Sequence, residues 1–282
     1  MPIVIFHQNM DKFTGTTAKR IKGYTTKLGA INAKTGSVYW AAGFTEVVSC
    51  KAVLRKILTR LAKKLDPGLT KLLVIEVGTT TFSKNPEYIG IAWDPDVLTV
   101  IYAGQVYYDL VAGGWKAFCV EEEDIKNQTV GLPEGLAFGK DTRGLAYIGC
   151  LDKNANPFLI GFMHNMYKVG ERNLAFAALP DMADKARKAI GGGYRAAEVI
   201  IGGDFNVEPR EPKPVRGDAL HLKARAARVG AGGTGAYIKT TNSHPYDFWT
   251  VSNVAITDAN ARVLTQTRAA NCSDHAGILL QR

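Results

Sequence analysis

The chain has 282 residues, of which 46% are apolar and 22% are charged, a balance typical of globular proteins rather than fibrous or low-complexity chains. No apolar run approaches the roughly 20 residues of a membrane-spanning helix. The 35 Lys and Arg residues outnumber the 26 Asp and Glu residues, and the resulting net charge of +9 favours a polyanionic partner. No linker, composition shift or internal repeat divides the sequence, so we expect a single domain over residues 1–282.

The first half of the chain alternates strand-like with helix-like patterns. Short apolar runs indicate strands, and apolar residues three or four positions apart indicate amphipathic helices. We expect strands at residues 2–6, 72–77, 88–93 and 98–107, and helices at residues 16–34 and 50–65. The last two strands flank the turn sequence Asp-Pro-Asp at residues 94–96 and therefore predict a β-hairpin.

The second half continues the same alternation. We expect strands at residues 145–151, 158–163, 198–201, 246–251, 262–266 and 276–280, and a helix at residues 172–190. The first two of these strands predict a second hairpin. Residues 208–235 are rich in Gly, Pro and basic residues and are predicted to be mostly loop. Hairpins interleaved with single helices predict an α/β fold of antiparallel or mixed sheets with helices outside.

Two short acidic motifs adjoin apolar strands in the last third of the chain. GGDFN occupies residues 202–206 after an apolar run, and SDH occupies residues 273–275 before another. A carboxylate at the end of a buried strand is costly unless a metal or a hydrogen bond offsets its desolvation. The two motifs together therefore suggest one site for a divalent cation and a phosphate.

Further polar residues occur beside other predicted strands. The candidate site residues are Asn9, Glu46, Glu87, Arg143, His164 and Asp247, together with Asp204, Asn206, Asp274 and His275 of the two motifs. Taken singly, His164 is compatible with a structural histidine, Asp247 with a turn residue and Asn9 with a loop cap. We assign no catalytic role to His7, His221 or His244. The set as a whole, rather than any one member, carries the functional interpretation.

With these residues the chain resembles the endonuclease/exonuclease/phosphatase superfamily, and within it the deoxyribonuclease I-like branch. That branch includes the catalytic subunit of cytolethal distending toxins. The resemblance runs from Asn9 to His275 and rests on the joint presence of the GDFN and SDH motifs with an early Asn and Glu. It implies a four-layered α/β sandwich with two packed mixed β-sheets flanked by helices, and a site where the sheets open at one end.

The resemblance also assigns residues to metal and phosphate binding. Glu46, Asn9 and Asp274 match the metal site, which in this family holds Mg²⁺ and accepts Mn²⁺. Asn9 and Asn206 match groups that contact the phosphate. Arg143 resembles a phosphate-contacting arginine. Oxygen ligands of this kind suit a hard divalent cation.

The same resemblance assigns the proton-transfer residues. His275 matches the general base, and Asp247 matches the carboxylate that orients it. His164 looks like the second catalytic histidine, with Glu87 as its partner. Asp204, together with the Asn two residues later, matches the pair that orients the nucleophile. A carboxylate beside an imidazole fixes its tautomer and stabilises its charged form.

The resemblance and the positive charge predict a magnesium-dependent endonuclease that hydrolyses phosphodiester bonds in DNA, with DNA favoured over RNA and a monomeric state expected. A phosphomonoesterase or phosphoinositide phosphatase on the same fold is the alternative. A catalytically silent binding module is disfavoured by the complete set of polar residues. Residues 3–6 are strand-like rather than part of a signal peptide, so both a cytoplasmic location and secretion after processing stay open.

Basic residues gather in four stretches, at residues 19–27, 55–64, 185–188 and 213–228. Each stretch alone is compatible with a solvated surface. Beside a phosphate-directed site, they become candidates for contact with a nucleic-acid backbone. The sequence favours residues 213–228, with Lys223, Arg225 and Arg228, as the first candidate and residues 19–27 as the second.

Overall fold

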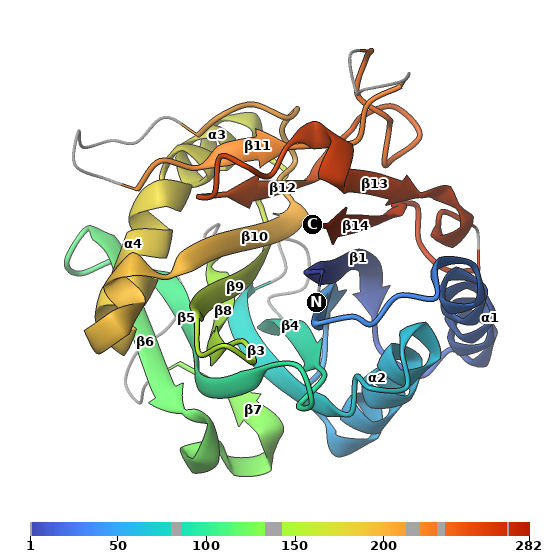
Figure 1. Cartoon of the computed structure of the whole chain (residues 1–282), viewed down its shortest axis with the longest axis horizontal. Helices are drawn as coiled ribbons and strands as arrows, with labels where there is room; N and C mark the ends of the chain where they lie inside the picture. The colour runs from blue at the N-terminus through green and yellow to red at the C-terminus, as the bar shows by residue number, and fades with distance from the viewer. Residues whose placement is uncertain (1, 80–85, 133–142, 213–219, 230–234, 270) are drawn as a thin grey trace.

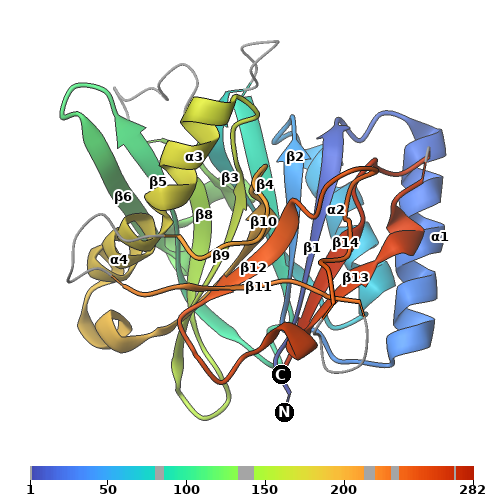
Figure 2. The ribbon, with the colours of Figure 1, turned by 90° about the horizontal axis from the view of Figure 1, so that it is seen from above.

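The computed structural model describes residues 2–79, 86–132, 143–212, 220–229, 235–269 and 271–282. Two seven-stranded β-sheets pack face to face, and helices cover the outer face of each (Figures 1 and 2). This arrangement confirms the predicted α/β sandwich. Among the described residues, no helix combines the length and the apolar character that crossing a lipid bilayer requires.

The first sheet has the strand order β13-β14-β1-β2-β4-β3-β7. Its strands are β1 (Val4–Phe13), β2 (Ala41–Val47), β3 (Lys71–Thr79), β4 (Pro86–Trp93), β7 (Thr129–Val130), β13 (Ala261–Leu264) and β14 (Gly277–Gln281). Strand β1 runs parallel to β2 and antiparallel to β14, so the sheet is mixed. Helices α1 (Ala18–Thr35) and α2 (Ala52–Leu65) bury Tyr24, Leu28 and Leu58 in the core on its outer face.

The second sheet has the order β11-β12-β10-β9-β8-β5-β6. Its strands are β5 (Thr99–Asp109), β6 (Gly114–Glu121), β8 (Leu145–Leu151), β9 (Pro157–His164), β10 (Glu198–Asp204), β11 (Lys223–Arg225) and β12 (Asp247–Val251). Helices α3 (Val169–Ala177) and α4 (Leu179–Ile190) cover its outer face. Short 3₁₀ helices lie at Glu122–Asp124, Lys126–Gln128, Gly192–Ala196, Asp258–Asn260 and Thr265–Thr267.

The inner faces of the two sheets form a continuous apolar core that includes Ile5, Ile91, Ile148 and Ile160. At one point the sheets approach so closely that only glycine fits. A Cβ atom added to Gly43 on β2 would overlap the ring of Phe162 on β9. This contact brings the ends of β2 and β9 together, and the polar residues that follow on each strand meet there.

Three predictions of secondary structure need correction. Residues 88–93 and 98–107 do not form a hairpin, because β4 belongs to the first sheet and β5 to the second. The predicted helix at residues 172–190 is two helices that meet at Ala178, and Pro180 occupies the first turn of the second. Strands β6, β7 and β11 lie outside the segments predicted as strands, and β11 lies within residues 208–235, which were predicted to be mostly loop. The second predicted hairpin is confirmed by the antiparallel pairing of β8 with β9.

Candidate active site

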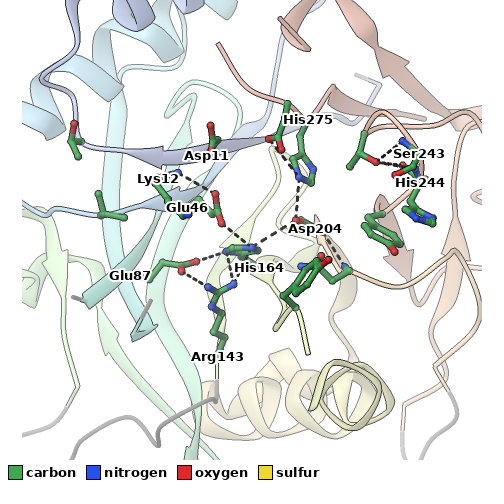
Figure 3. Close-up of a pocket in the computed structure, with 17 residues that line it drawn as sticks. Asp11, Lys12, Glu46, Glu87, Arg143, His164, Asp204, Ser243, His244 and His275 are labelled. Atoms are coloured by element: carbon green, nitrogen blue, oxygen red, sulfur yellow. Dashed lines mark hydrogen bonds and ion pairs between the residues drawn. The ribbon is translucent and has the colours of Figure 1, made fainter. Parts of the chain in front are cut away.

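A pocket of about 580 Å³ lies where strand ends from both sheets meet, and Figure 3 shows its side chains. Strand β1 begins near the N-terminus and ends near this pocket, so the site lies at the end of the sandwich away from the termini (Figure 2). The structure brings eight of the ten candidate residues to its wall: Glu46, Glu87, Arg143, His164, Asp204, Asn206, Asp274 and His275. Asn9 and Asp247 are buried behind the wall.

Glu46 reaches the pocket through an irregular backbone at the end of β2. Its φ is 55°, in the left-handed region that disfavours residues with a side chain. The pairing of β2 with β4 shifts between Phe44 and Val47. The carboxylate accepts a hydrogen bond from the Lys12 backbone N–H at 3.1 Å, and its other oxygen lies 3.2 Å from Nε2 of His164. A bulge of this kind re-aims one side chain.

His164 is held at the end of β9 by a buried ion pair. Its Nδ1 lies 2.5 Å from Oε1 of Glu87, and Arg143 lies 3.0 Å from the other Glu87 oxygen. The positive charges on His164 and Arg143 hold the pKa of Glu87 below its ordinary value, although burial alone would raise it. Burial and Arg143 would lower the pKa of His164, but Glu87 and Glu46 outweigh them and raise it.

Arg143 is engaged by protein groups in this arrangement. Besides Glu87, its guanidinium donates a hydrogen bond to the backbone oxygen of Asn165 at 3.0 Å. The Asn206 side chain donates to the same oxygen, also at 3.0 Å. Asn165 had no place in the sequence interpretation, although it lies beside His164 in the chain. Phosphate contact by Arg143 and Asn206 stays a prediction.

Asp204 lies between the two histidines. Its Oδ2 accepts a hydrogen bond from Nδ2 of Asn9 at 3.1 Å and lies 3.7 Å from Nε2 of both His164 and His275. The two imidazole nitrogens are therefore separated by no more than twice that distance. The other oxygen of Asp204 accepts the backbone N–H of Asn206 at 3.0 Å. One buried carboxylate thus sets the spacing of two potential proton carriers.

His275 has its own carboxylate partner. Its Nδ1 lies 2.7 Å from Oδ2 of Asp247, and its Nε2 faces the pocket, 3.8 Å from Asp274. Burial of the ring would lower the pKa of His275, but Asp247 and Asp204 outweigh it and raise the pKa well above its ordinary value. Asp274 is 66% exposed and therefore keeps most of its contact with solvent.

A third histidine, to which the sequence assigned no catalytic role, lies behind this pair. His7 is fully buried, with Nε2 3.1 Å from Oγ1 of Thr45 and Nδ1 3.8 Å from Oδ1 of Asp247. Burial lowers the pKa of His7 to about 3, so the ring is neutral. Only its position on an apolar strand marks it in the sequence, and that pattern is shared by many structural residues.

The rim of the pocket also holds His244, which the sequence interpretation left without a role. Its ring stacks on Tyr246 with the ring centroids 4.5 Å apart and the planes 3° from parallel. Both residues line the pocket, as does Tyr167. Aromatic rims of this kind can contact a flat group of a ligand.

The pocket has an excess of carboxylates that fits a divalent cation. Within the described part of the chain, Asp204, Asp247 and His275 form one group whose ligand atoms all lie within 4.8 Å of one another. Of the predicted ligands, Glu46 and Asp274 line the pocket, whereas the side-chain oxygen of Asn9 accepts the backbone N–H of Asp11. Burial raises the pKa of Glu46, so its charge lacks full compensation from the protein.

Comparisons with known proteins place the fold. No family model and no curated protein match this sequence. The human Nocturnin catalytic domain with bound sulfate anion superposes with a TM-score of 0.61 at 14% identity, over 99% of this chain and 93% of that one. An endonuclease/exonuclease/phosphatase family protein from Bacteroides thetaiotaomicron gives 0.58 at 16% identity, over 100% and 97%.

A third structure, TDP2 from D. rerio complexed with single strand DNA product, gives a TM-score of 0.55 at 12% identity, over 99% of this chain and 98% of that one. Each alignment spans nearly the whole of both chains, and the shared architecture is the one that the motifs implied. The resemblance to the toxin subunit stays a prediction. The chain has the fold of the endonuclease/exonuclease/phosphatase superfamily.

Proposed function

We propose that the protein is a divalent-metal-dependent phosphodiesterase that cleaves DNA internally. The observation that carries the proposal is the position of Asp204 between two histidines, 3.7 Å from Nε2 of each. Each histidine has a separate carboxylate on its Nδ1 side. A phosphate between the two Nε2 atoms would have one proton acceptor and one proton donor in reach, which general acid–base hydrolysis requires.

In this scheme His275 is the general base. Its Nδ1–H donates to Asp247 and its Nε2 faces the pocket, so the ring can take a proton from an attacking water once Nε2 is deprotonated. A cation bound beside Asp204 would favour that deprotonated state, because Asp204 is one of the charges that raise the pKa of His275. Asp204 and Asn206 hold the water and the phosphate in line. His164, whose raised pKa favours the protonated ring, gives a proton to the departing oxygen. Glu87 then stabilises the orientation of His164 through the whole cycle.

The proposed cation is Mg²⁺, with Mn²⁺ able to substitute. Glu46 and Asp274 would hold it, with Asn9 nearby, and the group of Asp204, Asp247 and His275 is the second possible position. Two of the three residues at the second position, His275 and Asp247, are already joined by a 2.7 Å hydrogen bond. When bound, the cation neutralises charge that develops on the phosphate oxygens.

The net charge of +9 supports DNA as the substrate, since a long polyanion gains most from a basic protein. The structural similarity to TDP2 with a bound DNA product supports the same choice. A phosphomonoesterase is the second candidate. A mannosyl-6-phosphatase from Bacteroides thetaiotaomicron shares the fold, and a pocket of about 580 Å³ lies in the size range of small-ligand sites.

The test is hydrolysis by the purified protein of supercoiled plasmid, phosphoinositides and a sugar 6-phosphate, each with Mg²⁺, Mn²⁺ or a chelator. We expect nicked and then linear plasmid with either metal, and no cleavage with the chelator. Rapid release of phosphate from the small esters without any plasmid nicking would select the second candidate. Absence of both activities at millimolar metal would contradict the proposed function.

A further inference from the structure

The positive charge of the chain is concentrated on two adjacent helices. Helices α1 and α2 together carry ten of the 35 Lys and Arg residues and contain no Asp or Glu. Removing those ten from the total leaves 25 basic residues against 26 acidic ones in the rest of the chain. The two helices therefore account for the whole net charge of the protein. They lie side by side on the outer face of the first sheet (Figures 1 and 2).

The exposed cations of each helix point away from its buried stripe. At about 100° per residue, the cations of α2 cluster on the side opposite its buried leucines Leu54, Leu58 and Leu61. The exposed cations of the N-terminal half of α1 lie opposite Leu28 in the same way. We call this surface the basic helical face, and it consists of Lys19, Lys22, Lys56, Arg60, Lys63 and Lys64.

The basic helical face has no ionic partners in the described part of the chain, where none of its six cations lies within 4.0 Å of a carboxylate. Two described cations of the segment at residues 213–228 differ. Lys223 lies 2.9 Å from Glu211, and Arg228 lies 2.6 Å from Asp258. Residues 213–219 of that predicted loop lie outside the described residues. The segment that the sequence favoured for nucleic-acid contact thus has protein partners for its described charges.

The charge pattern also works against the stability of the helices themselves. Lys56 and Arg60 are four residues apart, as are Arg60 and Lys64, and like charges at this spacing repel. Neither helix has an acidic residue in its first turn, where the helix dipole favours one. Helix stability therefore does not explain these residues. A polyanion bound across the face would reduce the repulsion between these like charges and would supply negative charge near the first turn of each helix.

The basic helical face begins at the rim of the active-site pocket. Thr14 and Val48 line the pocket and precede the first residues of α1 and α2 by only four positions each. Helix α1 has 18 residues and is therefore about 27 Å long. At a rise of about 3.4 Å per nucleotide, this length matches roughly eight nucleotides of one DNA strand. A strand whose reacting phosphate is in the pocket could therefore continue along the helices.

The composition of the face distinguishes nucleic acid from a membrane surface. Membrane-bound amphipathic helices insert large apolar side chains between their cations. Here the leucines of α2 are buried in the core, and Val53 is the exposed large apolar residue among the described residues of the two helices. We propose that the basic helical face binds the phosphate backbone of a long nucleic acid whose scissile phosphodiester occupies the pocket. The proposal rests on the proposed function for the identity of the substrate.

The experiment compares two fourfold variants with equal loss of charge. The face variant is Lys56→Gln, Arg60→Gln, Lys63→Gln and Lys64→Gln. The control variant is Lys153→Gln, Lys185→Gln, Lys188→Gln and Arg195→Gln, which lie away from α1 and α2. Binding of a 30-base-pair duplex is measured between 50 and 200 mM salt in the presence of a chelator, so that no cleavage occurs. Hydrolysis of a dinucleotide is measured separately with Mg²⁺.

We expect the face variant to bind the duplex at least tenfold more weakly at 100 mM salt. The slope of log affinity against log salt should become shallower by about 0.9 for each lost phosphate contact. The control variant should lose less than threefold, and dinucleotide hydrolysis should stay within twofold of the wild type. Equal losses in the two variants would overturn the proposal, because they would reflect total charge rather than this face.

Two further outcomes separate the alternatives. Tight binding of the wild type to phosphatidylserine vesicles that is lost in the face variant, with duplex binding unchanged, would overturn nucleic acid in favour of a membrane. If duplex binding depends on the face but the protein does not cleave plasmid, the binding role of the basic helical face is supported and the proposed function is contradicted. The face variant should melt no lower than the wild type, since repulsion is removed. If it melts lower, Arg60→Gln alone is compared with Arg195→Gln.

Discussion

Nδ1 of His275 lies 2.7 Å from Oδ2 of Asp247, and this contact decides which imidazole nitrogen faces the pocket. A carboxylate accepts hydrogen bonds, so the proton of the neutral ring stays on Nδ1 and the lone pair of Nε2 is presented to the substrate. Asp247 itself is buried. The geometry therefore couples one buried carboxylate to the basicity of the nitrogen that faces the pocket.

Asp247→Asn should lower kcat for plasmid nicking by about 10²- to 10⁴-fold, because an amide can donate to Nδ1 and hold the ring in the wrong tautomer. KM should change much less, since Asp247 does not line the pocket. Steady-state kinetics with circular dichroism of the variant check this. Activity within threefold of the wild type would show that the orientation of His275 has no part in turnover.

His164→Ala and His275→Ala should each lower turnover by roughly 10²-fold or more while the fold stays intact. His221→Ala is the matched control, since His221 is exposed and lies outside the pocket. The double variant should lose less than the product of the single losses if the two rings act on the same phosphate. Multiplicative losses would instead indicate that the two histidines act independently.

Addition of Mg²⁺ should raise the thermal midpoint of the wild type, since a ligand that binds only the folded state at one hundred times its Kd stabilises by about 2.7 kcal/mol. Glu46→Gln should abolish most of this rise and most of the cleavage, whereas the exposed control Glu123→Gln should keep both. A thermal midpoint that does not change with Mg²⁺ or Mn²⁺, together with plasmid cleavage that continues in the presence of a chelator, would exclude the metal site.

Protonation of His7 should destabilise the fold as the pH falls. The pKa of His7 is about 3 in the folded state against an ordinary value of 6.5, so the unfolded chain binds the proton more readily between these values. Its contribution is fully present above pH 6.5 and is lost towards pH 3, with a slope of up to about 1.4 kcal/mol per pH unit. Urea unfolding of wild type and His7→Gln between pH 7 and 4 measures the difference. Parallel stability curves would contradict the assignment.

Sequence patterns within a short segment correctly predicted elements, such as α2, whose form depends mainly on residues close together in the chain. Leu54, Leu58 and Leu61 recur at helical spacing, and α2 forms as expected. The failure at residues 88–107 has a different origin. The Asp94 side chain accepts a hydrogen bond from the backbone N–H of Asp96, which shapes a tight turn. Such a turn can connect two strands of a hairpin or two strands that belong to different sheets. Which sheet the second strand joins is decided by its pairing with β8, more than forty residues later.

The site was predictable in residue type more than in geometry. Asp204 could be chosen because a carboxylate at the end of a buried strand needs a partner, and Glu87 could be chosen from the family resemblance; both lie in the pocket wall. The burial of His7 behind Asp247 depends on packing between strands that are distant in sequence, so no local pattern marks it. Arg143 was selected from the sequence, but its ion pair with Glu87 could not be foreseen from either neighbourhood.

The left-handed backbone of Glu46 sets a trade-off between durability and chemistry at a single position. A residue that carries a Cβ atom costs about 1–2 kcal/mol in this conformation, and asparagine tolerates it better than most. Glu46→Asn would also remove a poorly compensated buried charge. Selection of a variant library for heat resistance alone should therefore enrich Glu46→Asn and yield stable proteins without activity. Engineering of thermostable variants of this chain consequently requires selection for turnover at every round.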